Sequence, residues 1–133
     1  MTIGTETEFP ALFEPLDLGS LQLKNRLVFG PHGSRFMEWH SHTATDRQAH
    51  YLAERARGGV GLVIQGSVMV HPTGLATAGM NQGWDTSCIP GYRLVTEAVH
   101  SEDCFIFAQV SHLGRQGHEV ASQRELWAPS AIP

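Results

Sequence analysis

The fold of this chain is decided at residues 51–64, which read YLAERARGGVGLVI. The first half of this stretch places apolar side chains such as Leu52 and Ala56 on one face of a helix. The glycine pair at 58–59 predicts the end of that helix, because glycine readily adopts the left-handed conformation that follows a last helical turn. The apolar run at 60–64 is typical of a parallel strand that is covered on both faces.

The beginning of the helix is also indicated by the sequence. We expect the helix to begin near Arg47, with Thr45 or Asp46 as its amino-terminal cap. Arg55 and Arg57 fall in its last turn, where positive charge interacts favourably with the helix dipole. Residues 45–64 therefore predict a complete helix that leads through a tight turn into a buried strand.

Further strands and one further helix are predicted on either side of this unit. A second helix is expected from about Ile89 to His100, and Gly19-Ser20 between apolar alternations predicts a small hairpin near the amino terminus. Three parallel strands are predicted, at Leu27–Gly30, Leu62–Gln65 and Phe105–Gln109. Strands that alternate with helices in this way favour an α/β fold with right-handed crossovers.

The lengths of the connections predict where a site is built. The loops after the strands are long, at 33–45 and 71–87, whereas the turns after the helices are short. Long loops at the carboxyl ends of parallel strands are where α/β proteins place their sites. We therefore expect the site to be lined by residues near Pro31, Gly66 and Gln109.

Composition excludes several classes of protein. The chain has 133 residues, of which 41% are hydrophobic and 17% charged, as expected for one globular domain. A net charge of −4 leaves no basic surplus for nucleic-acid binding. No apolar run approaches the roughly 20 residues of a membrane-spanning helix. Residues 1–11 carry no secretion signal, so we expect a flexible amino terminus and a cytoplasmic protein.

Common catalytic and metal-binding motifs are not present. Cys88 and Cys104 do not form a disulfide framework, and the spacing of the histidines matches no recognised metal site. The glycines at 58–61 precede a strand, whereas a dinucleotide fingerprint follows one, so they are interpreted as turn and packing residues. The residues by themselves therefore predict a scaffold and the place of a site, but no reaction.

Several segments carry a family resemblance in order and in spacing. They are LFEPL at 12–16, LKNR at 23–26, YLAERARGGVGLVI at 51–64, GYR at 91–93 and onward, AQVSHLGR at 108–115, and APSAI at 128–132. Together they resemble the old yellow enzyme family of FMN-dependent oxidoreductases. The resemblance implies that residues 12–133 are the N-terminal half of an FMN-binding (β/α)8 TIM barrel.

The resemblance also implies which residues contact the flavin. Pro31, His32 and Gly33 would approach the isoalloxazine from the first strand, largely through backbone groups. Gly66 or Ser67 would do so from the second strand, and Gln109 would hydrogen-bond the pyrimidine edge from the third. Small residues let the backbone approach a flat ring closely, and an amide both donates and accepts hydrogen bonds.

The Pro31-His32 pair resembles the amine-dehydrogenase branch of the family, in which a cysteine directly after the pair carries the flavin covalently. Gly33 occupies that position here. The resemblance therefore predicts that FMN is bound without a covalent bond.

Several of these residues also have interpretations that require no bound flavin or substrate. Without the motif around it, Gln109 would be interpreted first as the cap of a strand end. His112 is interpreted as a structural residue that holds the following loop by hydrogen bonds. Arg35 and Trp39 lie where a substrate could pass, although a role in a mobile loop fits equally well.

A complete barrel needs roughly 250 residues, which is more than this chain supplies. In the family, the pair of residues that grips the substrate, the tyrosine proton donor and the flavin phosphate site lie on later strands. Three explanations of the short length are considered, in decreasing order of preference. They are a truncated polypeptide, a split barrel completed by a second chain, and a reduced protein without catalysis. The parent enzyme is expected to take hydride from NADH or NADPH through FMN to a small-molecule substrate, as an ene-reductase, or to oxidise an amine. Assembly as a homo-oligomer is left open.

Overall fold

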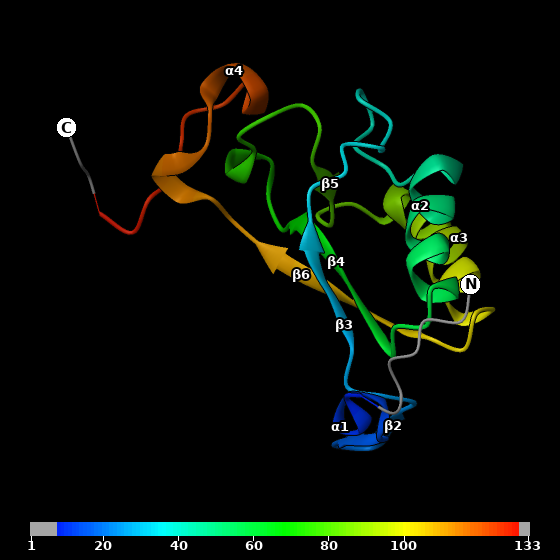
Figure 1. Ribbon diagram of the computed structural model, residues 1–133. Coiled ribbons are helices and arrows are strands. Elements are labelled where there is room, and N and C mark those ends of the chain that lie inside the picture. Colours follow the sequence, from blue (N-terminus) through cyan, green and yellow to red (C-terminus); the bar gives the residue numbers. More distant parts are fainter. Residues whose placement is uncertain (1–7, 131–133) are drawn as a thin grey trace.

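A parallel sheet forms the centre of the chain in the computed structural model, which describes residues 8–130. The central strand is β4 (Leu62–Met69), which pairs in parallel with β3 (Val28–His32) on one edge and with β6 (Phe105–Ser111) on the other. The very short β5 (Asn81–Gln82) pairs with the last residues of β4. The predicted order of parallel strands and intervening helices is confirmed (Figure 1).

The predicted hairpin lies before the sheet. It consists of β1 (Leu16–Leu18) and β2 (Leu21–Leu23), which pair in an antiparallel fashion and follow a short helix, α1 (Pro10–Phe13). The turn between the strands needs Gly19, whose φ of 61° lies in the left-handed region. Of the amino terminus that we expected to be flexible, residues 1–7 lie outside the described residues, and α1 begins at Pro10.

Two helices cover one face of the sheet (Figure 1). They are α2 (Asp46–Arg57) and α3 (Ile89–His100), as predicted. Thr45 caps α2, because its hydroxyl oxygen accepts a hydrogen bond from the Gln48 backbone N–H at 3.4 Å. The chain leaves α2 through Gly59, whose φ of 101° would strain any other residue.

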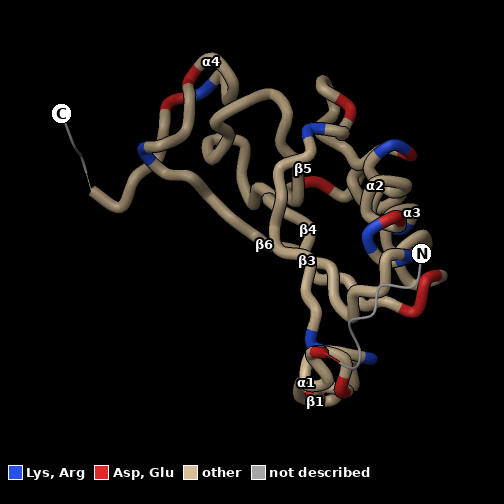
Figure 2. Tube along the Cα trace, in the orientation of Figure 1, with Lys and Arg blue, Asp and Glu red and all other residues tan. Residues whose placement is uncertain are grey.

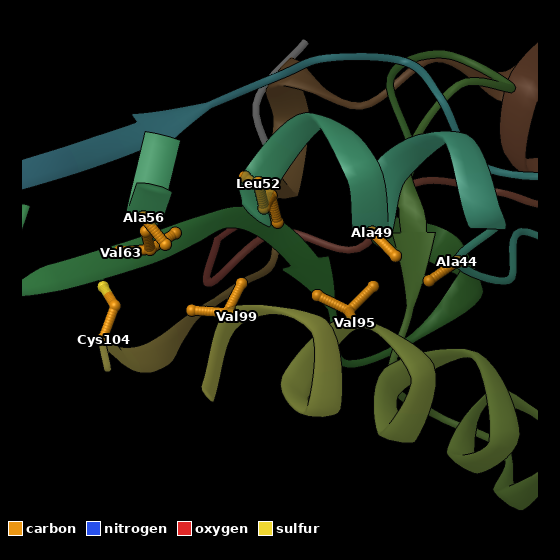
Figure 3. Close-up of a cluster of buried hydrophobic side chains, with 8 residues drawn as sticks. All are labelled: Ala44, Ala49, Leu52, Ala56, Val63, Val95, Val99 and Cys104. Carbon is orange, nitrogen blue, oxygen red and sulfur yellow. The ribbon is translucent and has the colours of Figure 1, made fainter. Parts of the chain in front are cut away.

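The core lies between these helices and the sheet (Figure 3). Val63 of β4 and Val95 and Val99 of α3 are completely buried in it. Small side chains of α2 allow the two helices to approach each other, and the cluster consists of Ala44, Ala49, Leu52, Ala56, Val63, Val95, Val99 and Cys104. The helical stripe read from the sequence is therefore the packed face.

Asn25 joins the amino-terminal ends of β3 and β4. Its amide nitrogen donates to the Gly59 carbonyl at 2.7 Å, and its amide oxygen accepts from the Leu27 N–H at 3.1 Å. A Cβ at Gly61 would lie 2.8 Å from the Asn25 carbonyl oxygen, so only glycine fits there. The segment that carries part of the family resemblance thus fixes the helix-to-strand turn against the first strand.

The face of the sheet opposite the helices is open. Val28 and Phe107 are on it, with 46% and 39% of their surfaces exposed. The strands β3, β4 and β6 carry no charged side chains (Figure 2), and within residues 8–130 the outer edge of β6 pairs with no strand. Open edges without charge normally pair with, or are covered by, further structure.

Two sequence predictions need correction. The strand predicted to end at Gln65 continues to Met69, because pairing with β5 and β6 extends the ladder beyond the apolar run. The segment predicted as a plain loop at 71–87 contains β5 and two short 3-10 turns, η1 (Pro72–Gly74) and η2 (Thr86–Cys88). The tail adds a third such turn, η3 (Gly114–Gln116), and the short helix α4 (Glu119–Ser122).

Cys88 and Cys104 are both free thiols and both buried. In the part of the chain that the structure describes, no helix is long and apolar enough to cross a membrane.

The packing of α3 predicts the effect of a truncation. Val99→Ala should lower the free energy of unfolding by about 1.5–3 kcal/mol, because it removes buried methyl groups and leaves a cavity. Urea denaturation monitored by circular dichroism measures this loss. Leu94→Ala on the same helix, where Leu94 is 38% exposed, is the control and should cost clearly less. Equal losses for the two variants would contradict the assignment of the core face.

Candidate functional site

The carboxyl ends of the three main strands are irregular at the positions where the sequence places its site. Gly30 and Pro31 of β3 together lie opposite the single residue Ile64 of β4, because the register shifts between Phe29 and His32. Gly66 and Ser67 of β4 likewise lie opposite the single residue Gln109 of β6. Bulges of this kind bend a strand and redirect its side chains, and they are frequent beside active sites.

Gly66 brings two of these strands into close contact. A Cβ at this position would lie 2.9 Å from the backbone nitrogen of His32 and 3.1 Å from the carbonyl carbon of Pro31. These are backbone atoms and cannot rotate away. Because Gly66 has no side chain, the backbone at Pro31 and His32 can lie at contact distance from β4.

The side chain of His32 is held by the helix layer. Its Nδ1 atom lies 2.7 Å from the hydroxyl oxygen of Tyr51 in α2, and the two rings are 5.9 Å apart between centroids. The Tyr51 ring is in turn covered by the Arg55 guanidinium, whose central carbon lies 3.5 Å from the ring centroid. With its side chain engaged by Tyr51, His32 has its backbone left to line the strand end.

Ser67 and Gln109 meet across the bulge. The Ser67 hydroxyl donates to the side-chain oxygen of Gln109 at 3.3 Å. This contact leaves the amide NH2 of Gln109 available, and Gln109 is exposed on the sheet. The structure thus brings together Pro31, His32 and Gly66 on one side, and Ser67 and Gln109 on the other.

A pocket of about 210 Å³ lies beside these residues. It is formed at the loop after β3 and the loop after β4, and its walls include Gly33, Arg35, Gly66, Ser67, Thr77, Gly79 and Asn81. Complete ligand pockets usually enclose about 300–1,000 Å³, so this one accommodates part of a ligand. None of its lining residues is acidic.

His112 connects two of the loops around the site. Its Nδ1 atom accepts from the Gly114 N–H at 3.0 Å, so the proton of the neutral ring is on Nε2, which lies 2.9 Å from the Thr73 hydroxyl. The same hydroxyl lies 2.8 Å from Nδ1 of His71, whose ring stacks on Trp127 with centroids 4.3 Å apart. The structural interpretation of His112 is confirmed by these hydrogen bonds.

Tyr92 is held by a structural contact rather than presented to the site. Its hydroxyl donates to the Gln82 carbonyl at 2.5 Å, and burial raises the pKa of Tyr92 well above its usual range. Within residues 8–130, no group of histidine, cysteine and acidic side chains could hold a metal ion.

The arrangement of strands and loops has counterparts among known proteins. A family model described as NADH:flavin oxidoreductase / NADH oxidase matches residues 11–132. This chain belongs to that family. Its fold is the N-terminal part of the (β/α)8 barrel of old yellow enzymes, which confirms the predicted fold class.

Individual relatives show the same membership. The chain is 36% identical over 122 residues to the metal reductase of Desulforamulus reducens, and 35% identical over 129 residues to the NADH oxidase of Thermoanaerobacter brockii. The old yellow enzyme from Trypanosoma cruzi superimposes with a TM-score of 0.86 at 29% identity, covering 95% of this chain. The chain spans only 18%, 20% and 36% of the lengths of these proteins.

The family implies a flavin, and the residues present fit one. A flat ring needs walls without side chains, which Gly66 and the Pro31–His32 backbone supply at the bulged strand ends. Its polar edge needs an amide, which Gln109 supplies. These are residues that would hold FMN at the ends of the strands.

Sequence reasoning missed Asn81 of β5. Its side chain is 1% exposed, lines the pocket, and has no hydrogen-bond partner for either amide atom within the described residues. The only signal in the sequence is its place in a loop rich in glycine, threonine and asparagine, which does not distinguish it from its neighbours.

Two glycines of the site allow a matched comparison. Gly66→Ala should cost about 1–3 kcal/mol of stability, because its Cβ would meet backbone atoms of β3. Gly33→Ala should stay within about 0.5 kcal/mol, since a Cβ there meets nothing within 4 Å. Denaturant unfolding of both variants measures the difference. If both changes were equally mild, the close approach of β3 to Gly66 would not exist in solution.

Proposed function

We propose that this chain is the flavin-facing first part of an FMN-dependent oxidoreductase that uses NADH or NADPH. The observation that carries the proposal is the set of bulged strand ends, where Gly66 admits the Pro31–His32 backbone and Ser67 orients Gln109. Family membership supplies the cofactor class.

Each of these residues has a distinct task in the proposal. The backbone at Pro31, His32 and Gly33, with Gly66 or Ser67, forms the wall against which the flavin ring lies. Gln109 hydrogen-bonds the pyrimidine edge, and its orientation is set by the Ser67 hydroxyl at 3.3 Å. Bound FMN supplies two-electron transfer between the nicotinamide and a small organic substrate. The protein's part is to position the ring and exclude water from one face.

The proposed flavin contacts are compatible with more than one substrate class. An unsaturated carbonyl compound or a dienoyl thioester fits the reductive branch, and an amine fits the branch that the Pro31-His32 pair resembles. A cytoplasmic location and a homo-oligomeric assembly stay predictions.

A second candidate is a half-barrel subunit that has no catalysis of its own and needs a second chain. The exposed apolar side chains of Val28 and Phe107 on the open face of the sheet, and the uncharged edge of β6, favour it. Purification that preserves partners distinguishes the candidates, because only a subunit of a split barrel brings a second chain with it.

The first prediction of the proposal concerns the isolated chain. We expect it to bind FMN weakly and to show no nicotinamide-dependent reduction of an enone such as 2-cyclohexenone. The phosphate contacts of the family lie on later strands, and each lost charge-assisted hydrogen bond costs roughly 1.5–3 kcal/mol. Several such losses weaken binding by orders of magnitude. Absorbance at the flavin bands after gel filtration, and consumption of NADH and NADPH, measure both properties.

Two outcomes would change the proposal for the isolated chain. If the chain alone retained stoichiometric FMN and reduced the enone as a monomer, the missing groups would be supplied by residues within it. Activity that appears only after a second chain is added would support the subunit candidate.

The second prediction concerns the attachment of the flavin. Acid precipitation of the flavin-loaded protein should release the yellow colour into the supernatant, because Gly33 stands where the covalent branch has cysteine. Free FMN mixed with unfolded protein is the control for trapping. Colour that remains with the washed pellet would contradict non-covalent binding.

A further inference from the structure

The pocket beside Gly66 and Ser67 is also lined by Arg35 and Asn81, neither of which has a part in the proposed flavin contacts. Arg35 comes from the loop after β3, and Asn81 comes from β5. Neither lies at a strand end that faces the proposed flavin ring. Three observations set them apart: the backbone conformation of Arg35, its packing against Gly79, and the buried amide of Asn81.

Arg35 has an unusual backbone conformation. Its φ is 56°, in the left-handed region that residues with a side chain rarely adopt. Such conformations persist where the surrounding structure maintains them, and they are concentrated at functional sites. The Arg35 side chain lines the pocket, whereas Arg47 and Arg55 of α2 pack on aromatic rings.

Gly79 makes room for the Arg35 side chain. A Cβ at Gly79 would lie 3.2 Å from Cγ and 3.5 Å from Cδ of Arg35. The aliphatic part of the arginine is therefore packed against the backbone of the loop after β4. Within residues 8–130 no acidic side chain forms a salt bridge with its guanidinium.

Asn81 is the second, independent observation. Its side chain is 1% exposed, yet Nδ2 and Oδ1 both lack a hydrogen-bond partner. A buried amide without partners is costly, and native proteins nearly always satisfy such groups with protein, water or ligand. Because Asn81 lines the pocket, a small rotation of its enclosed side chain would bring the amide to a polar group bound there.

The chemistry of the walls selects the ligand. The pocket offers one permanent positive charge, the hydroxyls of Ser67 and Thr77 and the Asn81 amide, and no acidic residue lines it. Met37 and Met80 add apolar walls that suit a short carbon stem. Guanidinium groups bind carboxylates with good geometric fit through paired N–H donors. A volume of about 210 Å³ suits a carboxylate with a short carbon stem.

We propose that Arg35 and Asn81 form a subsite for a carboxylate group of the substrate, next to the flavin-facing residues Gly66 and Ser67. The inference rests on the proposed function and narrows its substrate class to small acids, either unsaturated acids or amino acids with a substituted nitrogen. A carboxylate held by Arg35 and Asn81 would orient the rest of the substrate, so the subsite would determine specificity and orientation.

The test uses the flavin-loaded protein, isolated with whatever segment or chain completes its barrel. Crotonate and sarcosine, each with its methyl ester, are titrated while the flavin absorbance spectrum is recorded. The protein should bind at least one acid about ten- to a hundredfold more tightly than the ester, as one charge-assisted contact implies. Arg35→Met should remove this preference. Arg93→Met, which removes an exposed arginine of α3, is the matched control and should retain it.

Asn81→Leu adds a readout that does not depend on activity. The change removes an amide without partners while keeping the volume, so the denaturation midpoint should stay the same or rise. Affinity for the acid should fall, with little change for the ester. A lower midpoint with unchanged acid affinity would show that Asn81 is purely structural and would overturn its part in the subsite.

The phosphate of FMN is the other anion that this chemistry could hold. Affinities for FMN and riboflavin are therefore compared in the Arg35→Met variant. A loss of affinity confined to FMN would assign Arg35 to the phosphate and overturn the proposal, whereas affinities for both flavins that match those of the unsubstituted protein support it. Absence of any preference for acid over ester in the unsubstituted protein would also overturn it.

Failure of the proposed function remains distinguishable from failure of the subsite. If the protein takes up no flavin, the proposed function fails, and the acids are then titrated into the flavin-free protein by calorimetry. Acid binding that Arg35→Met reduces at least tenfold would sustain the subsite, and no binding would overturn it.

Discussion

The structure depends on one constraint, which is that the backbone of β4 must be hydrogen-bonded along both edges while the helices α2 and α3 bury one of its faces. Val63 is completely buried beneath the helices, and the ladders to β3 and β6 use the two edges. Buried backbone groups without partners are costly, so the register of both neighbours is fixed by β4. The helices α2 and α3 are then the connections that return the chain to the start of each parallel strand.

The site follows from the places where this regular pairing is interrupted. Both bulges fall at the carboxyl ends, at Gly30–Pro31 against Ile64 and at Gly66–Ser67 against Gln109. They leave backbone and small residues at the surface where a regular ladder would present alternating side chains. The absence of a side chain at Gly66 lets β3 pass at contact distance, so packing and site geometry share one cause.

The part of the barrel described by residues 8–130 is closely packed on the helix side and open on the other. The helix-facing cluster is buried, whereas Val28 and Phe107 on the opposite face are substantially exposed. In a closed barrel such side chains fill the interior together with those of the remaining strands. The stability of this chain and its affinity for a flavin therefore both depend on what covers the open face.

The sequence by itself determined the order of elements and the place of the site, because those rest on local signals. Apolar periodicity, the Thr45 cap and Gly59 act within a few residues of each other, and long loops after strands identify the functional end. The old yellow enzyme resemblance added the barrel and the candidate contacts at Pro31, His32, Gly33, Gly66, Ser67 and Gln109. Only the tertiary structure decided that β4 continues to Met69, that His32 is held by Tyr51, and that Asn81 is buried without partners beside Arg35. These features depend on segments far apart in the chain, and pairing and burial between such segments leave no local pattern in the sequence.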